Sequence, residues 1–392
     1  MSLRSSRAVA VALVTFACFT DITAYSIAVP VLPDLSRRLG ASPTMIGFLF
    51  ASFGVTLLTV SVPMGAVSDR IGRRVPMVGG LVALAAASLL FSFARSLPVL
   101  FAARLVQGAA DAITWVVGFA LIADRYGVDE RGRVTGFVMS GTSVSFMIGP
   151  SIGGYLYELG GIGLPFLFVA VLAVASAASF LLIELPASHT RHEPVPFTTV
   201  LRVPAVAVCT MAVVAASATL SMLEPVLALH LGTLSVGPAR IGLVFGVAAV
   251  FNVMLHPVCG HLADRFGARR MMMLGLSLTS FTLAMAGQSW SFASAIALQL
   301  PLVATVALMI TPSLAYMGEA TSLSGAPSFG VAYGLYNMAW GAGLLGGPAV
   351  GGFLFERLGF SRLTIAWGPA LLLITALLAG VQSRRSPTQE RV

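Results

Sequence analysis

Three acidic residues lie well inside long apolar segments of the 392-residue sequence: Asp21, Asp111 and Glu224. A charged carboxylate at the centre of a membrane helix costs at least about 2.5 kcal/mol, so such residues usually face a water-filled path for a substrate or an ion. A carboxyl group that binds a proton on one side of the membrane and releases it on the other is the simplest device for proton coupling. These residues therefore predict a path for protons or for substrate, with Asp21 and Asp111 near the membrane midplane and Glu224 in the outer half.

Arg104 is the one arginine inside an apolar segment, and it stands seven residues before Asp111, on the same face of one helix. The two residues could share a polar strip, or one of the buried charges could serve in a structural ion pair between helices. Tyr25 follows Asp21 by one helical turn and shares its face. We expect a cavity for amphipathic organic compounds, with these candidate lining residues: Tyr25, Gln107, Trp115, Asn337 and Trp340.

The sequence lacks the patterns of common enzymes. It has no phosphate-binding Walker loop and no Gly-x-Ser-x-Gly turn, and its five histidines do not have the spacing of metal ligands. Cys18, Cys209 and Cys259 fall in apolar segments and are expected to be packing residues. We therefore expect a protein that is not an enzyme, with no metal and no cofactor, and with protons as the coupling ion.

The composition indicates an integral membrane protein made of helices. Hydrophobic residues make up 57% of the chain and charged residues 10%, compared with about 25% charged residues in soluble domains. A helix that crosses a bilayer needs about 20 mostly apolar residues. Twelve such segments are predicted, at 8–32, 43–66, 75–94, 97–123, 133–158, 162–185, 204–231, 239–262, 271–288, 291–318, 328–355 and 361–381.

The formal net charge of +8 reflects topology rather than nucleic-acid binding. All 23 basic residues are arginines, and sixteen of them fall at the termini and in alternate loops. We call this side of the membrane the arginine-rich side. Cytoplasmic loops carry an excess of basic residues, so both termini are predicted to be cytoplasmic. Six arginines fall on the opposite side: Arg37, Arg38, Arg95, Arg240, Arg357 and Arg362.

A ten-residue pattern, G-x-x-x-D-R-x-G-x-R, occurs twice, and the two copies start 195 residues apart in a chain of 392. Each copy joins two apolar segments on the arginine-rich side. Glycine suits tight turns and close helix contacts. The pattern consists of Gly65, Asp69, Arg70, Gly72 and Arg74 in the first copy and of Gly260, Asp264, Arg265, Gly267 and Arg269 in the second.

A second repeat supports a division of the chain into two related halves. Gly149-Pro150-x-x-Gly153-Gly154 corresponds to Gly347-Pro348-x-x-Gly351-Gly352. We predict two six-helix bundles, 1–185 and 204–392, related by a pseudo-two-fold axis along the membrane normal. The proline-containing segment 186–203 is the predicted cytoplasmic linker.

These motifs resemble those of the major facilitator superfamily over nearly the whole chain. The paired loops resemble its loop signature, Arg104-x-x-Gln107-Gly108 resembles its R-x-x-Q-G signature, and Gly141 with Gly149, Pro150, Gly153 and Gly154 resembles the motif of its drug and metabolite antiporters. The resemblance implies that Arg104 modulates proton movement. It also implies that Asp69 and Asp264 act as gates, each engaging the positive end of a helix from the other half.

A narrower resemblance points to vesicular amine transporters and bacterial multidrug exporters. It rests on Asp21 nine residues before Pro30, on Leu223-Glu224-Pro225, and on Asp124 with Glu130-Arg131-Gly132. The chain departs from that group at Phe53, where the group carries a lysine. It also has no acid in the tenth and eleventh predicted spans, and the nearest polar residue in the eleventh is Asn337.

The sequence thus predicts a monomeric, multi-pass protein of the inner membrane that exports amphipathic organic molecules, cations included, in exchange for protons by alternating access. Its expected partners are the small-molecule substrate, protons and membrane lipid, and not nucleic acid. A nutrient symporter or facilitator, a lipid or lysolipid translocase, and a receptor-like protein without transport remain alternatives.

Overall fold

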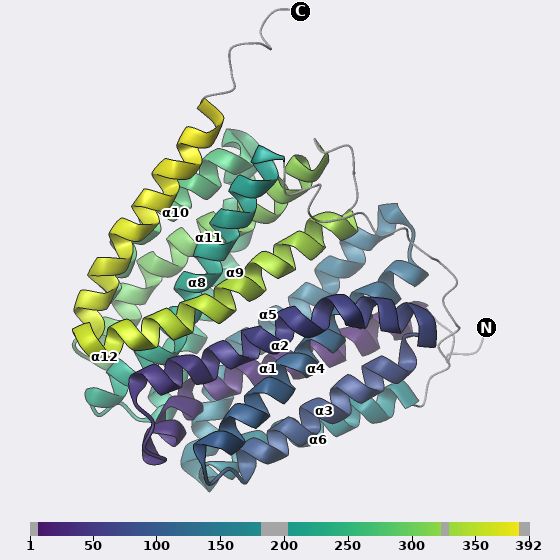
Figure 1. The fold of residues 1–392 in the computed structure, drawn as a ribbon, viewed down its shortest axis with the longest axis horizontal. Coiled ribbons are helices and arrows are strands. Elements are labelled where there is room, and N and C mark those ends of the chain that lie inside the picture. The colour runs from purple at the N-terminus through teal and green to yellow at the C-terminus, as the bar shows by residue number, and fades with distance from the viewer. Residues whose placement is uncertain (1–6, 182–202, 323–328, 384–392) are drawn as a thin grey trace, which may run out of the picture. The chain divides into compact units, whose positions relative to one another are not determined.

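The computed structural model describes residues 7–181, 203–322 and 329–383, and its described secondary structure is helical (Figure 1). The last element contains Gly359 in a non-helical conformation (φ 74°), which divides it into two helices and brings the described total to twelve. The elements are α1 Arg7–Arg38, α2 Pro43–Ile71, α3 Arg74–Ser92, α4 Leu97–Arg125, α5 Val128–Gly160, α6 Gly163–Leu181, α8 Pro204–Thr233, α9 Pro238–Phe266, α10 Ala268–Ala286, α11 Phe292–Ser322 and α12 Phe329–Ser383.

The predicted all-helical fold with twelve helices is confirmed, and several helices are longer than the predicted spans. α1 continues six residues past its predicted end to Arg38, and α2 five residues to Ile71. Hydropathy detects only the apolar part of a helix, whereas backbone hydrogen bonding continues into the polar turns that follow. The end of the sixth predicted span and the predicted linker 186–203, apart from Val203, lie outside the described residues.

Nine of the described helical elements are long and apolar enough to cross a membrane, with the two halves of α12 counted together. α5 and α10 are not among them, because α5 has polar ends and glycine and serine at its centre, and the 19-residue α10 has Arg269 and Arg270 in its first turn and carries four serine and threonine residues. Large apolar side chains such as Val171, Met254 and Trp290 are exposed. An outer surface of this kind suits contact with lipid, and the chain is a multi-pass membrane protein.

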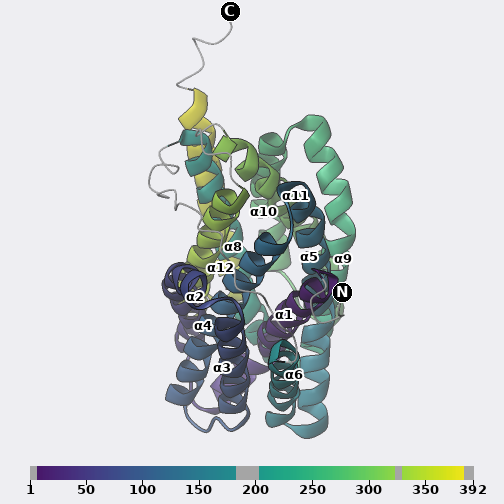
Figure 2. The same cartoon turned by 90° about the vertical axis from the view of Figure 1, so that its right-hand side faces the viewer.

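Contacts between α-carbons group the chain into two units. The first comprises 1–192 together with 228–249, and the second comprises 193–227 together with 250–392. In the first unit α1 packs against α4, α5 and α6, while α3 packs against α4 and α6 (Figure 2). In the second unit α10 packs against α11 and α12. The predicted bundles 1–185 and 204–392 stay a prediction.

The internal repeat is visible in the packing of glycines. A Cβ atom added to Gly153 of α5 would lie 2.8 Å from the carbonyl oxygen of Ile27 in α1, and one on Gly351 of α12 would lie 2.3 Å from the side chain of Met222 in α8. Ile27 and Met222 stand 195 residues apart, as do the two loop motifs. In each half, an equivalent glycine thus lets the fifth helix pack closely against the first.

Two adjacent glycines of α12 test this packing. A Cβ on Gly347 would lie 2.2 Å from the carbonyl oxygen of Ala218, whereas a Cβ on Gly346 would meet nothing within 4 Å. We expect Gly347→Ala to cost about 1–3 kcal/mol through overpacking. Gly346→Ala should cost nothing, since alanine is the better helix former. Thermal unfolding of the two purified variants measures the difference, and equal stability would contradict the packing.

Candidate functional site

Two of the three predicted acids meet in the first unit. Asp111 is the central residue of α4, fourteen residues from each end, and Asp21 lies at a similar depth in α1. Both are buried, with Asp21 only 1% exposed. Their carboxyl groups interact with each other, and two adjacent carboxyl groups favour a state in which one of them carries a proton. The Trp115 Nε1–H group donates to Asp21 Oδ2 at 3.0 Å.

Arg104 lies beside this pair, in the same unit. Its side chain is fully buried, and its Nη1 donates to Gln107 Oε1 at 2.6 Å. The charge of Arg104 acts on Asp111 across the two helical turns between them. The first unit thus brings together most of the predicted site, namely Asp21, Tyr25, Arg104, Gln107, Asp111 and Trp115.

The remaining candidates belong to the second unit. Glu224 of α8 is half-buried, and Asn337 of α12 is exposed. Trp340 stacks on Tyr336 with ring centroids 6.3 Å apart, and its carbonyl accepts a hydrogen bond from Ser217. Their participation in one cavity with Asp21 stays a prediction.

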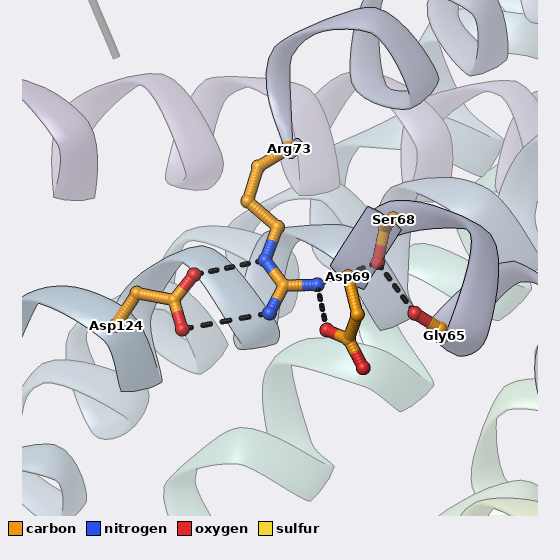
Figure 3. Close-up of polar contacts among 5 residues, drawn as sticks. All are labelled: Gly65, Ser68, Asp69, Arg73 and Asp124. Atoms are coloured by element: carbon orange, nitrogen blue, oxygen red, sulfur yellow. Dashed lines mark hydrogen bonds and ion pairs between the residues drawn. The ribbon is translucent and has the colours of Figure 1, made fainter. Parts of the chain in front are cut away.

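The first loop motif on the arginine-rich side is held by a residue that the sequence analysis missed. Arg73 forms ion pairs with Asp69 (2.6 Å) and Asp124 (2.8 Å), and its Nη1 donates to Ser68 Oγ (Figure 3). Its side chain is only 7% exposed. Burial lowers the pKa of a guanidinium, but the hydrogen bonds and charges of Asp124 and Asp69 raise the pKa of Arg73 above its usual value. Arg73 therefore stays charged and ties the end of α2 to the end of α4.

The other residues of this motif shape the turn. Gly72 has φ 85°, and its counterpart Gly267 has φ 93°, a backbone conformation that favours glycine, so the predicted tight turns are confirmed. Arg74 donates to the carbonyl groups of Phe180 and Leu181, the last residues of α6. Arg70 is exposed.

The second loop motif lacks this network. Ala268 occupies the position of Arg73, and among the described residues Asp264 has no ion pair. Arg265 lies over the ring of Phe266 at 5.2 Å, and Arg269 is half-buried. In the sequence, the one sign of this network was that Arg73 of the first loop is replaced by Ala268 in an otherwise matching second loop. A Cβ on Gly65 would make an ordinary 3.7 Å contact with Val116, and one on Gly260 would meet nothing.

Arg73→Ala should destabilise the protein, because it removes the cation that pairs with both Asp69 and the largely buried carboxylate of Asp124. The loss of one partner of a buried ion pair costs about 3–5 kcal/mol. Arg70→Ala, which removes an exposed arginine from the same loop, is the control and should change stability by less than about 0.5 kcal/mol. Thermal unfolding of both purified variants checks this, and similar losses would contradict the network.

On the opposite side of the membrane, α5 packs closely against the beginning of α9 within the first unit. A Cβ on Gly154 would lie 2.2 Å from the carbonyl oxygen of Pro238, and one on Gly242 would lie 2.1 Å from that of Pro150. Ser151 Oγ donates to the carbonyl of Gly242 at 3.3 Å. The glycines of the antiporter-like motif thus serve two contacts. Gly141, Gly149 and Gly153 face Thr15, Ser26 and Ile27 of α1, and Gly154 faces α9.

Polar residues that the sequence analysis did not select surround this contact. Glu158 Oε1 accepts a hydrogen bond from the backbone N–H of Ala239, in the first turn of α9, at 3.0 Å. A carboxylate at the N-terminus of a helix is stabilised by the helix dipole. The Tyr157 hydroxyl donates to Asp34 at 2.5 Å, and Asp34 pairs with Arg37 and Arg38. These groups join the ends of α1, α5 and α9.

Comparisons with known proteins agree with this architecture. The sequence matches the profile of the Major Facilitator Superfamily over residues 14–232 and again over 206–392. It is 30% identical to the vesicular acetylcholine transporter of Rattus norvegicus over 85% of the chain and 65% of the relative, and 27% identical to the chromaffin granule amine transporter of Homo sapiens over 83% and 63%. The chain thus spans slightly less than two thirds of the length of these relatives.

Solved structures show the same fold at low sequence identity. A bacterial homolog of the human lysosomal transporter Spinster, in an inward-facing and occupied conformation, superposes with a TM-score of 0.80 at 13% identity, covering 96% of this chain and 97% of the other. The nucleoside transporter NupG gives 0.78 at 11% identity, covering 95% and 98%. Two matches to one profile, one for each half, carry the assignment: this chain is a membrane transporter, not an enzyme, and belongs to the major facilitator superfamily.

Proposed function

We propose that the protein is a proton-coupled antiporter that exports amphipathic organic molecules, cations included, across the inner membrane by alternating access. The observation that carries this proposal is the Asp21–Asp111 pair, two buried carboxyl groups near the centres of α1 and α4 that interact with each other. Two adjacent carboxyl groups rarely ionise together, so a cation that arrives at the pair favours release of the shared proton. Competition of this kind is the simplest form of exchange.

The surroundings of the pair support an organic substrate. Trp115 stacks obliquely on Phe119 with centroids 5.6 Å apart, and Tyr25 meets Phe146 at 6.4 Å. Aromatic faces beside a carboxylate suit organic ammonium groups. The names of the relatives, transporters of acetylcholine and of amines, support the same class of substrate. Glu224 and both loop motifs are assigned to this cycle as part of the proposal.

A drug-susceptibility screen tests the function. An efflux-deficient bacterium that expresses the chain should tolerate higher concentrations of amphipathic cations such as ethidium, and cells that express Asp21→Asn at the same level should not. Uptake of a nutrient with protons would instead indicate the symporter alternative. Movement of fluorescent lysolipid between bilayer leaflets, with no change in drug tolerance, would indicate the translocase.

A further inference from the structure

The guanidinium group of Arg104 lies among three aromatic rings. Its Cζ atom is 4.7 Å from the ring centroid of Phe50, 5.2 Å from that of Phe53 and 5.2 Å from that of Tyr25. Phe50 and Phe53 come from α2, and Tyr25 comes from α1. A cation over an aromatic face gains about 0.5–2 kcal/mol, with the larger values where water is excluded. We call these three rings the aromatic box.

Tight backbone packing fixes the aromatic box. A Cβ on Gly108, one turn after Arg104, would lie 2.3 Å from the carbonyl oxygen of Phe53 and 2.4 Å from Thr56 Oγ1. This glycine therefore brings α4 directly against the backbone of α2. Phe50 and Phe53 are almost fully buried, and interior side chains are close-packed in rotamer minima. This packing holds the three rings in place around the guanidinium group.

The aromatic box determines how far the positive charge of Arg104 lies from the carboxyl pair. Arg104 and Asp111 are separated by seven residues, or about 10.5 Å along the helix axis. The guanidinium therefore influences the pair through its charge across this distance. A long arginine side chain without the rings on either side of it would be drawn towards the carboxyl groups by that charge.

We propose that Phe50 and Phe53 are positioning residues that hold Arg104 at a fixed distance from the Asp21–Asp111 pair and so set the pH at which the pair exchanges its proton. This inference rests on the proposed function of the pair as the proton carrier. Few other titratable groups of α1 to α6 could set the pH of this proton exchange. In the central turns of α1 to α6 the titratable residues are Cys18, Asp21 and Tyr25 on α1 and Arg104 and Asp111 on α4, while those of α2, α3 and α5 lie in their end turns and the described α6 has none.

Trp115 supplies a test that does not depend on transport. Its indole donates to Asp21, so its fluorescence responds to the charge of the pair. In the full chain with Trp290, Trp340 and Trp367 replaced by phenylalanine, emission is titrated against pH in lipid nanodiscs. The midpoint in Phe53→Leu should fall by about one pH unit, because a cation that moves to within 4–6 Å of a carboxyl group favours its charged form. Phe50→Leu should shift it in the same direction.

Three variants complete the experiment. Phe53→Tyr keeps an aromatic ring and should have the same midpoint as the parent protein. Arg104→Gln removes the positive charge and should raise the midpoint. Phe91→Leu is the matched control, since Phe91 is a buried, stacked ring of α3 that is not one of the three rings around Arg104, and it should leave the midpoint unchanged. An unshifted midpoint in both Phe53→Leu and Phe50→Leu, or an equal shift in Phe91→Leu, overturns the inference. Failure of the proposed function gives a different result. The parent protein then shows no pH transition in its emission, or shows one that Asp21→Asn leaves unchanged.

Discussion

Asp21→Asn is expected to lower proton-driven export of ethidium from proteoliposomes at least about tenfold. A factor of ten corresponds to one pKa unit, or about 1.36 kcal/mol. Asparagine keeps the shape of the side chain and an oxygen that accepts from Trp115, but it does not titrate and so cannot bind and release a proton in each cycle. Asp111→Asn removes the other half of the pair and should have the same effect. The measurement is the initial rate of ethidium movement after a pH gradient is imposed.

Glu130→Gln is the control for this experiment. Glu130 also is an acid on a membrane helix, but its side chain is 58% exposed and forms a long ion pair with Arg7 at 3.7 Å. Exposed pairs contribute little, so export should stay at the wild-type rate. If Asp21→Asn and Asp111→Asn both export ethidium as fast as Glu130→Gln does, the carboxyl pair is not the proton carrier.

A disulfide between α5 and α9 is expected to stop transport completely. A Cβ built on Gly246 lies 3.8 Å from the Cβ of Ser151, which is about the mean Cβ–Cβ distance of a disulfide bond. Ser151→Cys combined with Gly246→Cys should therefore cross-link on mild oxidation. The proposed alternating-access cycle moves the predicted bundles 1–185 and 204–392 against each other and opens this contact, so the cross-linked protein should lose export and regain it after reduction.

The single variants control for damage by the substitutions themselves. Each single cysteine should transport equally with and without oxidant, since Cys18, Cys209 and Cys259 are buried. Full export by a protein shown by gel mobility to be cross-linked would mean that α5 and α9 stay together during transport. The proposed cycle would then be wrong.

The features that follow from local composition could be predicted from the sequence. Twelve apolar segments gave the helices, and two matching loops gave the tight turns at Gly72 and Gly267, because glycine readily adopts a positive φ. The break at Gly359 also falls in the predicted loop between the last two spans. These features depend on few neighbours in the chain.

The partners of the charged residues could not be predicted, because they depend on which helix faces meet. Asp21 meets Asp111 because α1 and α4 approach closely, and a Cβ on Gly118 would lie only 3.1 Å from Val14. Nothing in the spacing of either helix specifies that approach. Arg73 occupied a variable position of the loop motif, and its partner Asp124 lies 51 residues away. Glu158 fell in the last turn of its helix, where a carboxylate usually faces solvent.

The most direct test of the central claim is to measure proton release when an organic cation binds. Tetraphenylphosphonium is added to the purified protein in a weakly buffered solution that contains a pH indicator. The wild-type protein is expected to release protons as the cation binds, and the protein with both Asp21→Asn and Asp111→Asn is expected to release none. Binding without proton release by the wild-type protein, or equal release by both proteins, would contradict the account.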